Sequence, residues 1–202
     1  MYQKYGKRLL DILGSFILLV ILSPFLLIFS IISYFVSGFP IFFYQLRGGR
    51  HERIFLIWKF RTMDSSDVDS PGHSYQWGYE VPQNFTFEKP DHIKITKVGK
   101  IYRKYSIDEL PQLWNVLIGD MSLVGPRPEM IEITTHYSPI QKKRLLMRPG
   151  ITGYAQIRGR STITHGEKLK YDLYYVENCS FFLDLKILIN TFWIVVTGKW
   201  SS

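Results

Sequence analysis

The adjacent carboxylates Asp108 and Glu109 are the residues of this 202-residue chain best suited to chemistry. One carboxylate can act as a nucleophile while its neighbour helps to hold a divalent cation, because hard cations favour oxygen ligands. A structural interpretation competes with this one, since Ser106 with Glu109 three residues later is a capping-box pattern. Pro111 lies too far inside for an undistorted helix that begins just before Asp108. We therefore expect an irregular backbone at this pair.

Four arginines lie near this pair or beside constrained turns, where they could bind phosphate oxygens. Arg127 stands between two prolines, which fix φ and orient its planar guanidinium for bidentate binding. Arg148 precedes a Pro-Gly turn and Arg160 follows a glycine, which lets backbone N–H groups approach an anion. Arg103 lies five residues before Asp108. The alternative is a set of rigid turns and a solvated or membrane-facing basic patch.

The composition narrows the class of ligand. The net charge of +8 and the isoelectric point of about 9.5 suit anionic lipid, phosphorylated substrates or nucleic acid. The chain has neither a P-loop nor a G-x-G-x-x-G signature. Its single cysteine, Cys179, excludes an intrachain disulfide and a cysteine metal cluster, as in a reducing compartment. The five histidines show no ligand spacing, so we assign no zinc site.

The N-terminal region predicts a membrane segment. Residues 12–46 contain no charged side chain, and basic residues flank them on both sides. Residues 12–36 could cross a bilayer, which takes roughly 20 apolar residues, yet both flanks favour the cytoplasmic side. Ser23-Pro24 near the middle predicts a helix-break-helix hairpin that enters one leaflet and returns. The alternative is an ordinary span with a tolerated proline kink. The apolar stretch is longer than a signal-peptide core, and no cleavage site closes it.

The remaining pattern predicts an α+β fold that is mainly helical. A β-hairpin should pair residues 41–45 with 54–63 through Gly48-Gly49. Helices are expected at 110–118 with a stop at Gly119, at 129–146, and at 181–196 as an interfacial helix. We divide the chain into a re-entrant membrane hairpin at 1–40 and a cytosolic domain at 41–202. Within that domain, the turn-rich and aromatic-studded stretch 64–92 is a variable insertion.

Several long motifs, in order, resemble the bacterial sugar transferase family, the monotopic polyprenyl-phosphate phosphoglycosyl transferases. The resemblance covers nearly the whole chain and is specific because it rests on many segments. Larger relatives carry an additional N-terminal block of membrane spans, so this chain resembles the minimal catalytic form. The segments are Lys7-Arg8-Leu9-Leu10-Asp11, Ser23-Pro24, Lys59-Phe60-Arg61-Thr62-Met63, Ile95-Thr96-Lys97-Val98-Gly99, Asp108-Glu109-Leu110-Pro111-Gln112-Leu113-Trp114-Asn115-Val116, Gly119-Asp120-Met121-Ser122-Leu123-Val124-Gly125-Pro126-Arg127-Pro128, Arg148-Pro149-Gly150-Ile151-Thr152-Gly153 and Tyr171-Asp172-Leu173-Tyr174-Tyr175.

The resemblance implies a reaction and a location. Asp108 would be the nucleophile that attacks the β-phosphorus of a UDP-sugar, with Glu109 as its partner in a catalytic dyad. UMP would leave, and undecaprenyl phosphate would then accept the phosphosugar. Mg²⁺ near Asp108 would neutralise charge together with Arg103 and Arg127. The resemblance also implies a break at Ser23-Pro24 and a catalytic domain on the cytoplasmic face of the bacterial inner membrane. Further implied site residues are Lys59, Arg160 and Asp172.

Some questions stay open at this stage. Many relatives carry a second glycine where this chain has Glu52, so the geometry of that turn is uncertain. The insertion 64–92 is expected to contribute to the choice of sugar, which the sequence does not name. The apolar hairpin could pack against a second copy, so a homodimer is one alternative. A non-catalytic basic membrane-surface scaffold is the competing function. Nucleic-acid binding is suggested by charge alone, and the apolar hairpin argues against it.

Overall fold

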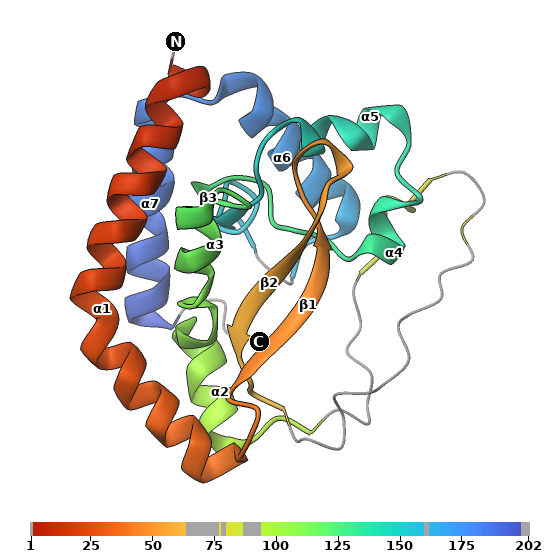
Figure 1. The fold of residues 1–202 in the computed structure, drawn as a ribbon. Helices are drawn as coiled ribbons and strands as arrows, with labels where there is room; N and C mark the ends of the chain where they lie inside the picture. Colours follow the sequence, from red (N-terminus) through yellow and green to blue (C-terminus); the bar gives the residue numbers. More distant parts are fainter. Residues whose placement is uncertain (1, 64–76, 78–79, 87–93, 160–161, 199–202) are drawn as a thin grey trace.

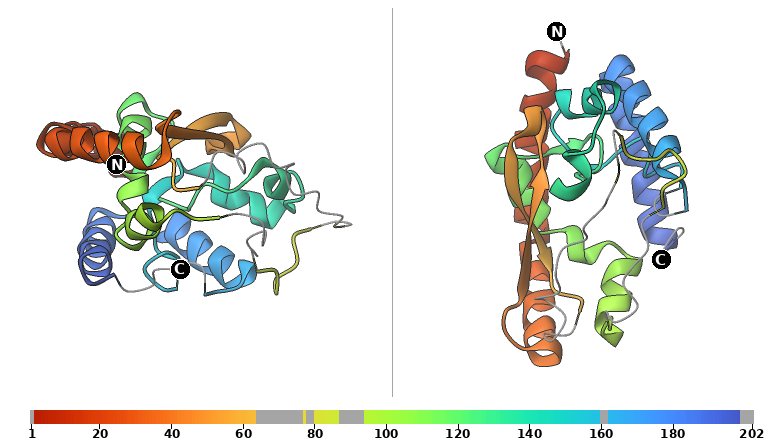
Figure 2. Two further views of the ribbon diagram at one scale, coloured as in Figure 1. Left: turned by 90° about the horizontal axis from the view of Figure 1, so that it is seen from below. Right: turned by 90° about the vertical axis from the view of Figure 1, so that its right-hand side faces the viewer.

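The computed structural model describes residues 2–63, 77, 80–86, 94–159 and 162–198. The described part is mainly helical with two small two-stranded sheets, as the sequence predicts. A long helix, α1, lies along one side of the molecule, and the β1–β2 hairpin crosses its middle (Figure 1). Figure 2 shows α1 with this hairpin on one side, the helices of residues 165–197 on the opposite side, and the segments of residues 122–152 between them.

Helix α1 spans Lys7–Ser37 and follows a short π-helix, η1, at Tyr2–Gly6. The sequence predicts two arms separated by a break, whereas the structure has a single helix that bends near its middle (Figure 1). Pro24 has no N–H to donate to the carbonyl of Val20, one turn earlier. The Ser23 hydroxyl donates to that carbonyl instead, at 2.8 Å. Because this hydrogen bond satisfies the Val20 carbonyl, the helix continues through the proline.

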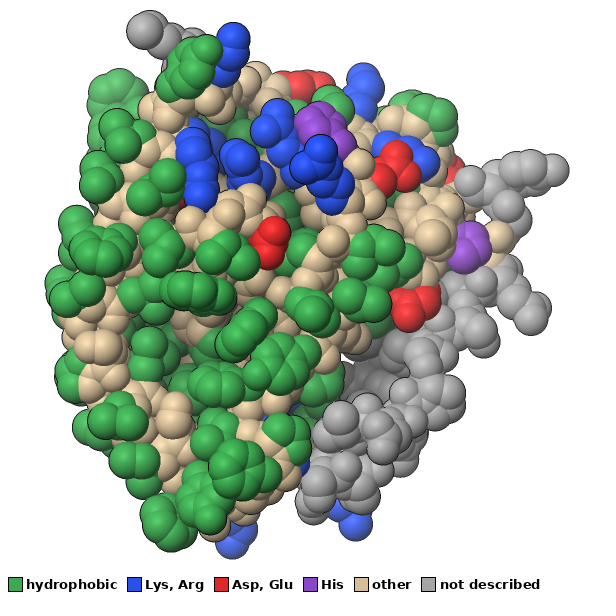
Figure 3. Space-filling view, viewed as in Figure 1, with side chains coloured by type: hydrophobic (Ala, Val, Ile, Leu, Met, Phe, Trp, Pro, Cys, Tyr) green, Lys and Arg blue, Asp and Glu red, His purple; other side chains and the backbone are tan. Residues whose placement is uncertain are grey.

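Both ends of α1 are joined to the rest of the chain. Near its start, Lys7 forms a buried ion pair with Asp184 of α7, with 2.7 Å between Nζ and Oδ2. Near its end, the Tyr102 hydroxyl of α2 donates to the carbonyl of Phe29 at 2.9 Å. The opposite face of α1 exposes apolar side chains (Figure 3). By length and composition, the helix is also able to cross a membrane.

The β1–β2 hairpin confirms the predicted pairing. Strand β1 at Phe42–Gly48 runs antiparallel to β2 at Ile54–Phe60, with Phe42 opposite Phe60. The connection is longer than the predicted Gly48-Gly49 turn, because the 3₁₀-helix η2 at Arg50–Glu52 is part of it. Glu52 has a φ of 62°, in the left-handed region that glycine adopts without strain. A glycine would adopt this backbone conformation without strain.

Helices α2 and α3 frame the predicted reactive pair. Helix α2 at Lys97–Lys104 begins at Thr96, whose side chain accepts a hydrogen bond from the N–H of Gly99. Helix α3 at Gln112–Ile118 ends where the sequence predicts, because Gly119 adopts a φ of 102°.

The second sheet shows a packing role for Gly150 and Gly153, which the sequence analysis predicts to let backbone N–H groups approach an anion. Strand β3 at Ser122–Val124 runs parallel to β4 at Gly150–Thr152. A Cβ atom on Gly150 would come within 2.1 Å of the Gly125 nitrogen, and one on Gly153 within 2.1 Å of the Gly125 oxygen. These glycines therefore let two backbone segments cross closely, which is a packing role.

The prediction of a single helix at 129–146 is wrong. The structure divides this stretch into α4 at Ile131–Thr134, α5 at Pro139–Lys142 and the 3₁₀-helix η5 at Lys143–Leu146. Ser138 and Gln141 form a capping box, and the first residue of α5 is a proline. Proline cannot donate to the preceding turn, so the chain begins a new helix here.

Two helices close the fold. Helix α7 at Phe181–Thr197 matches the expected C-terminal helix, whereas α6 at His165–Asn178 was not foreseen. Val124 of β3 packs with Tyr175 of α6 and Ile187 of α7 in one apolar cluster of the core.

Part of the stretch 64–92, which the sequence predicts to be an insertion, packs on the core. Trp77 and Phe85 lie against a cluster that contains Val81 and Tyr137. The N–H of His165 donates to the Phe85 carbonyl at 2.8 Å. These contacts attach residues 80–86 to α4, α5 and the start of α6. Residues 64–76, 78–79 and 87–92 of the insertion lie outside the described residues.

Candidate active site

A short 3₁₀-helix, η4 at Ile107–Glu109, holds the carboxylate pair between α2 and α3. Ser106 before it has a left-handed φ of 54°, and its side chain makes no capping bond to this turn. The capping-box interpretation therefore does not hold, and the expected irregular backbone is present. Asp108 and Glu109 are both buried. Acidic side chains that are buried without capping a helix need another source of stabilisation.

For Glu109, that source is a pair of cations from distant segments. Lys59 of β2 places Nζ 3.2 Å from Oε1 of Glu109. Arg127, from the turn after β3, places Nη2 2.6 Å from the same oxygen and Nη1 3.5 Å from Oε2. Burial lowers the pKa of Lys59, and the Glu109 carboxylate opposes that shift. Glu109 is thus a fixed anion that positions two cations at the site.

Asp108 is held differently from its neighbour. In the described part of the chain, its carboxylate forms no ion pair and accepts no hydrogen bond. Burial and the nearby Glu109 charge raise the pKa of Asp108, while Lys59, Arg103 and Arg127 lower it. The Asp108 oxygens are therefore uncommitted inside a cationic environment, which suits a nucleophile.

Arg103 reaches the site from α2. Its Nε donates to the Thr62 hydroxyl at 2.9 Å, which fixes the guanidinium next to the end of β2. Burial lowers the pKa of Arg103, and the charges of Asp108 and Glu109 oppose this shift. Arg103 thus contributes positive potential at Asp108 without a direct bond to it.

Asp172 lies behind the site and acts through an arginine that the sequence analysis missed. Arg144 of η5 is buried, and its Nη2 lies 2.6 Å from Oδ2 of Asp172. The same nitrogen donates to the backbone carbonyl of Arg127 at 2.9 Å. Tyr137 and Glu129 complete the cluster around Arg144. Asp172 is therefore a positioning residue for the Arg127 turn.

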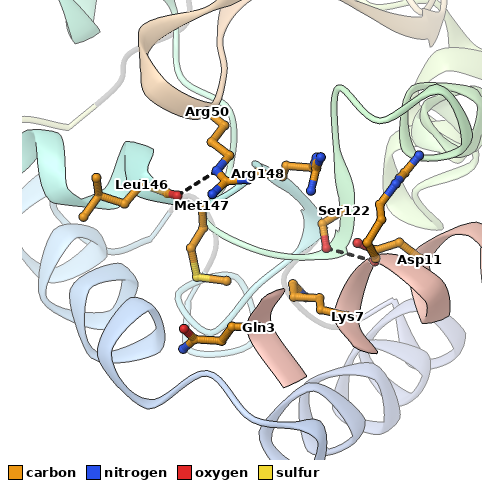
Figure 4. Close-up of a pocket in the computed structure, with 9 residues that line it drawn as sticks. Gln3, Lys7, Asp11, Arg50, Ser122, Leu146, Met147 and Arg148 are labelled. Carbon is orange, nitrogen blue, oxygen red and sulfur yellow. Dashed lines mark hydrogen bonds between the residues drawn. The ribbon is translucent and has the colours of Figure 1, made fainter. Parts of the chain in front are cut away.

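The other predicted site residues are not gathered at the dyad. Arg148 donates from Nε to the Gly119 carbonyl at 2.8 Å, beyond the far end of α3. It lines a separate pocket near the start of α1 (Figure 4). Arg160 lies outside the described residues. Ser23 and Pro24 lie in the middle of α1, as described above.

The site fits a divalent cation only in a limited way. The described residues contain no group of three or more His, Cys, Asp or Glu side chains that could hold a metal. Mg²⁺, however, is commonly bound by one or two carboxylates together with substrate phosphates and water. The uncommitted oxygens of Asp108 meet that smaller requirement, whereas those of Glu109 already bind Lys59 and Arg127.

The chain is similar to several known proteins along most of its length. The chain is 44% identical to the sugar transferase EpsL of Bacillus subtilis over 92% of its length and 84% of EpsL. It is 38% identical to the UDP-glucose:undecaprenyl-phosphate glucose-1-phosphate transferase of Klebsiella pneumoniae, over 92% of this chain but 39% of that protein. A galactosyl transferase, CpsE of Streptococcus agalactiae, is 42% identical over 98% of this chain and 44% of its own length. Residues 2–198 match the profile described as "Bacterial sugar transferase", and the chain therefore belongs to the bacterial sugar transferase family.

Proposed function

We propose that this protein transfers a sugar 1-phosphate from a UDP-sugar to undecaprenyl phosphate and so starts a membrane-linked glycan. The substrates named for relatives, including the Klebsiella protein and a galactose phosphotransferase of Salmonella typhimurium, support the reaction class. The observation that carries the proposal is the buried Asp108 carboxylate, which forms no ion pair in the described part of the chain and is subject to the positive charges of Lys59, Arg103 and Arg127. A buried charge without a bonding partner is costly, and active sites are where such groups are retained.

In the first step, an oxygen of Asp108 attacks the β-phosphorus of the UDP-sugar. An oxygen–phosphorus bond forms, and the bond from that phosphorus to the bridging oxygen breaks, so that UMP leaves with the electron pair. In the second step, an oxygen of undecaprenyl phosphate attacks the same phosphorus and Asp108 leaves as a carboxylate. The products are UMP and undecaprenyl-diphosphate sugar, so all atoms are accounted for.

The side chains around Asp108 would support both steps through charge. Arg127 and Arg103 would neutralise the phosphate oxygens, which otherwise repel an anionic nucleophile. Glu109 would keep Lys59 and Arg127 in place, because its carboxylate binds both cations. Asp172 would hold the backbone of the same turn through Arg144.

A Mg²⁺ ion would be held by Asp108 together with the diphosphate of the donor. When bound, it would supply Lewis-acid stabilisation of charge on the phosphate oxygens.

We further propose that α1 is re-entrant and that the catalytic domain lies on the cytoplasmic face of the bacterial inner membrane. Contacts to the catalytic domain at both ends of α1, through Lys7 and Phe29, support this topology. A helix that crossed the bilayer would place one of these ends on the opposite side. The exposed apolar face of α1 would then lie in one leaflet, where a polyprenyl phosphate can approach along the headgroup plane.

The insertion 64–92 is proposed to contribute to the choice of sugar, because its described residues pack beside α4 and α6. Trimming 64–76 would test this idea, and an unchanged preference among UDP-sugars would contradict it. A homodimer formed through the apolar face of α1 is a further proposal, which mass photometry in nanodiscs would test.

The first experiment measures Mg²⁺-dependent release of UMP from a panel of UDP-sugars with undecaprenyl phosphate added. Turnover on one sugar, abolished by Asp108→Asn, would support the reaction and name the donor. A folded, membrane-bound protein that releases no UMP from any donor would favour the non-catalytic scaffold. Release that survives Asp108→Asn would reject Asp108 as the nucleophile.

A further inference from the structure

A second group of cations lies apart from the dyad, near the N-terminal end of α1. Arg8, Arg50 and Arg148 line a pocket of about 100 Å³ together with Lys7 and Asp11 (Figure 4). By the same measure a single water needs roughly 10–15 Å³, so the pocket has room for a group of several heavy atoms.

The three arginines are not neutralised by carboxylates. In the described part of the chain, none of them lies within 4.0 Å of an acidic oxygen, whereas Lys7 is paired with Asp184. Each arginine is instead oriented by backbone carbonyls, which leaves other N–H groups available. Arg8 donates to Val116 at 2.6 Å and to Leu117 at 2.9 Å, Arg50 to Leu146 at 3.0 Å and Arg148 to Gly119 at 2.8 Å.

The pocket is electropositive as a result. Burial lowers the pKa of Arg148, and the charges of Arg8 and Arg50 lower it further. Asp11 opposes this shift, but its carboxylate already accepts bonds from the hydroxyl of Ser122 and from a backbone N–H. Like charges that converge in this way favour a bound anion.

The position of the pocket indicates which anion. Figure 3 shows Lys and Arg side chains gathered toward the N-terminal end of α1, next to the broad apolar surface. Leu146, which lines the pocket, is an exposed apolar residue, and so is Leu9, which follows Arg8 in α1. An amphiphile could place its tails along this surface and its charged headgroup in the pocket.

We propose that this pocket binds the phosphate headgroup of an anionic membrane phospholipid and is separate from the catalytic site. Arg8 contacts the C-terminal end of α3, whereas Asp108 precedes its N-terminal end. The seven residues of α3, at about 1.5 Å per residue, separate the two sites by roughly 10 Å. A phosphate held in the pocket is too far away to attack a phosphosugar on Asp108. The proposal rests on the embedding of α1 in a leaflet, and it does not rest on the chemistry of the dyad.

Binding of short-chain phosphatidylglycerol to the full chain in detergent tests this directly. Isothermal titration would compare it with short-chain phosphatidylcholine and with inorganic phosphate, and each lipid would be kept below its critical micelle concentration. Wild type should prefer phosphatidylglycerol.

Arg50→Gln should weaken binding about fivefold, the factor for one basic residue near an anionic lipid. Arg50→Gln with Arg148→Gln should weaken it at least twentyfold. Arg53→Gln removes an exposed arginine of the same turn that does not line the pocket, and it should change nothing.

Several outcomes would overturn the proposal. Equal weakening by Arg53→Gln would mean that overall charge, and not the pocket, attracts the lipid. Equal binding of phosphatidylcholine would assign the effect to the apolar surface, and equal binding of inorganic phosphate would indicate a site for free anions. A raised KM for undecaprenyl phosphate in Arg50→Gln, with phosphatidylglycerol binding retained, would assign the pocket to the acceptor.

Because binding is measured without turnover, failure of the proposed reaction would not affect this result. Arg50 is exposed, so its variant is expected to fold.

Discussion

The dyad and the junction between α1 and α7 both bury carboxylates, but only the junction gives every carboxylate a partner. At the junction, Asp184 binds Lys7 at 2.7 Å, the Tyr2 hydroxyl at 2.5 Å and the Tyr175 hydroxyl at 2.6 Å. At the dyad, Glu109 takes both close cations and Asp108 takes none in the described part of the chain. A fully bonded buried charge fixes structure, whereas an uncommitted one remains available for reaction.

Breaking the junction should give the largest change in stability. Asp184→Leu leaves the Lys7 charge buried without its partner, and we expect a loss of about 3–5 kcal/mol in the free energy of unfolding. Denaturant unfolding in lipid nanodiscs measures this loss. Lys7→Met combined with Asp184→Leu should recover much of it, because no lone charge then remains. A single variant as stable as the double variant would contradict the role assigned to the pair.

Removing a cation from the dyad should instead act on turnover. Arg127→Gln is expected to lower kcat about 10²–10³-fold, the range seen when one preorganised donor is lost from a transition state. The fold should persist, because the Arg127 side chain is 43% exposed. Steady-state release of UMP and a melting curve measure the two effects separately. Lys143→Gln, at an exposed position, serves as the control, and a kcat for Arg127→Gln within threefold of it would be inconsistent with the proposed site.

The uncommitted carboxylate should reduce the stability of the folded protein. Because the pKa of Asp108 is raised in the folded state, its ionised form at neutral pH is less favourable there than in the unfolded chain. Asp108→Asn removes that charge and should raise the free energy of unfolding by about 1 kcal/mol while abolishing turnover. Thermal unfolding at neutral pH tests this, and a clear loss of stability would show that Asp108 is structurally bonded after all.

The smallest predicted effect is a shift in pH dependence. The charge of Arg103 lowers the pKa of Asp108, so Arg103→Gln should raise that pKa. Since the nucleophile must be ionised, the acid limb of kcat/KM should move to higher pH in this variant. Lys104→Gln, an exposed neighbour on α2, should leave the limb in place. Profiles of UMP release against pH for the two variants test this prediction. An unchanged acid limb in Arg103→Gln would mean that the charge of Arg103 does not act on Asp108.

Local patterns account for the parts of the fold that the sequence predicts correctly. The β1–β2 hairpin follows from β-branched and aromatic runs, and the end of α3 follows from Gly119. The irregular backbone at Asp108 follows from Pro111. The helix predicted at 129–146 failed although the sequence carries a readable stop, since Ser138, Pro139 and Gln141 form a capping box with proline at the first helical position.

The partners of the buried charges could not be predicted in this way. Arg144 and Asp172 are 28 residues apart, and Lys7 and Asp184 are 177 apart. Spacing rules report only side chains within one helical turn or on facing strands. Arg148 is predicted to join the substrate site because, like Arg127, it lies beside a constrained turn. The structure places Arg148 beyond the C-terminal end of α3, whereas Arg127 binds Glu109 before its N-terminal end. The sequence therefore identifies reactive residue types, and the fold decides which of them meet.

A covalent phosphosugar on Asp108 is the most direct test of the central claim. The protein is incubated with the UDP-sugar that supports turnover, in the absence of undecaprenyl phosphate, and is then digested and analysed by mass spectrometry. We predict a sugar-phosphate adduct on Asp108 that appears with one equivalent of UMP and disappears when undecaprenyl phosphate is added. Release of UMP without an adduct, or an adduct on another residue, would contradict the account.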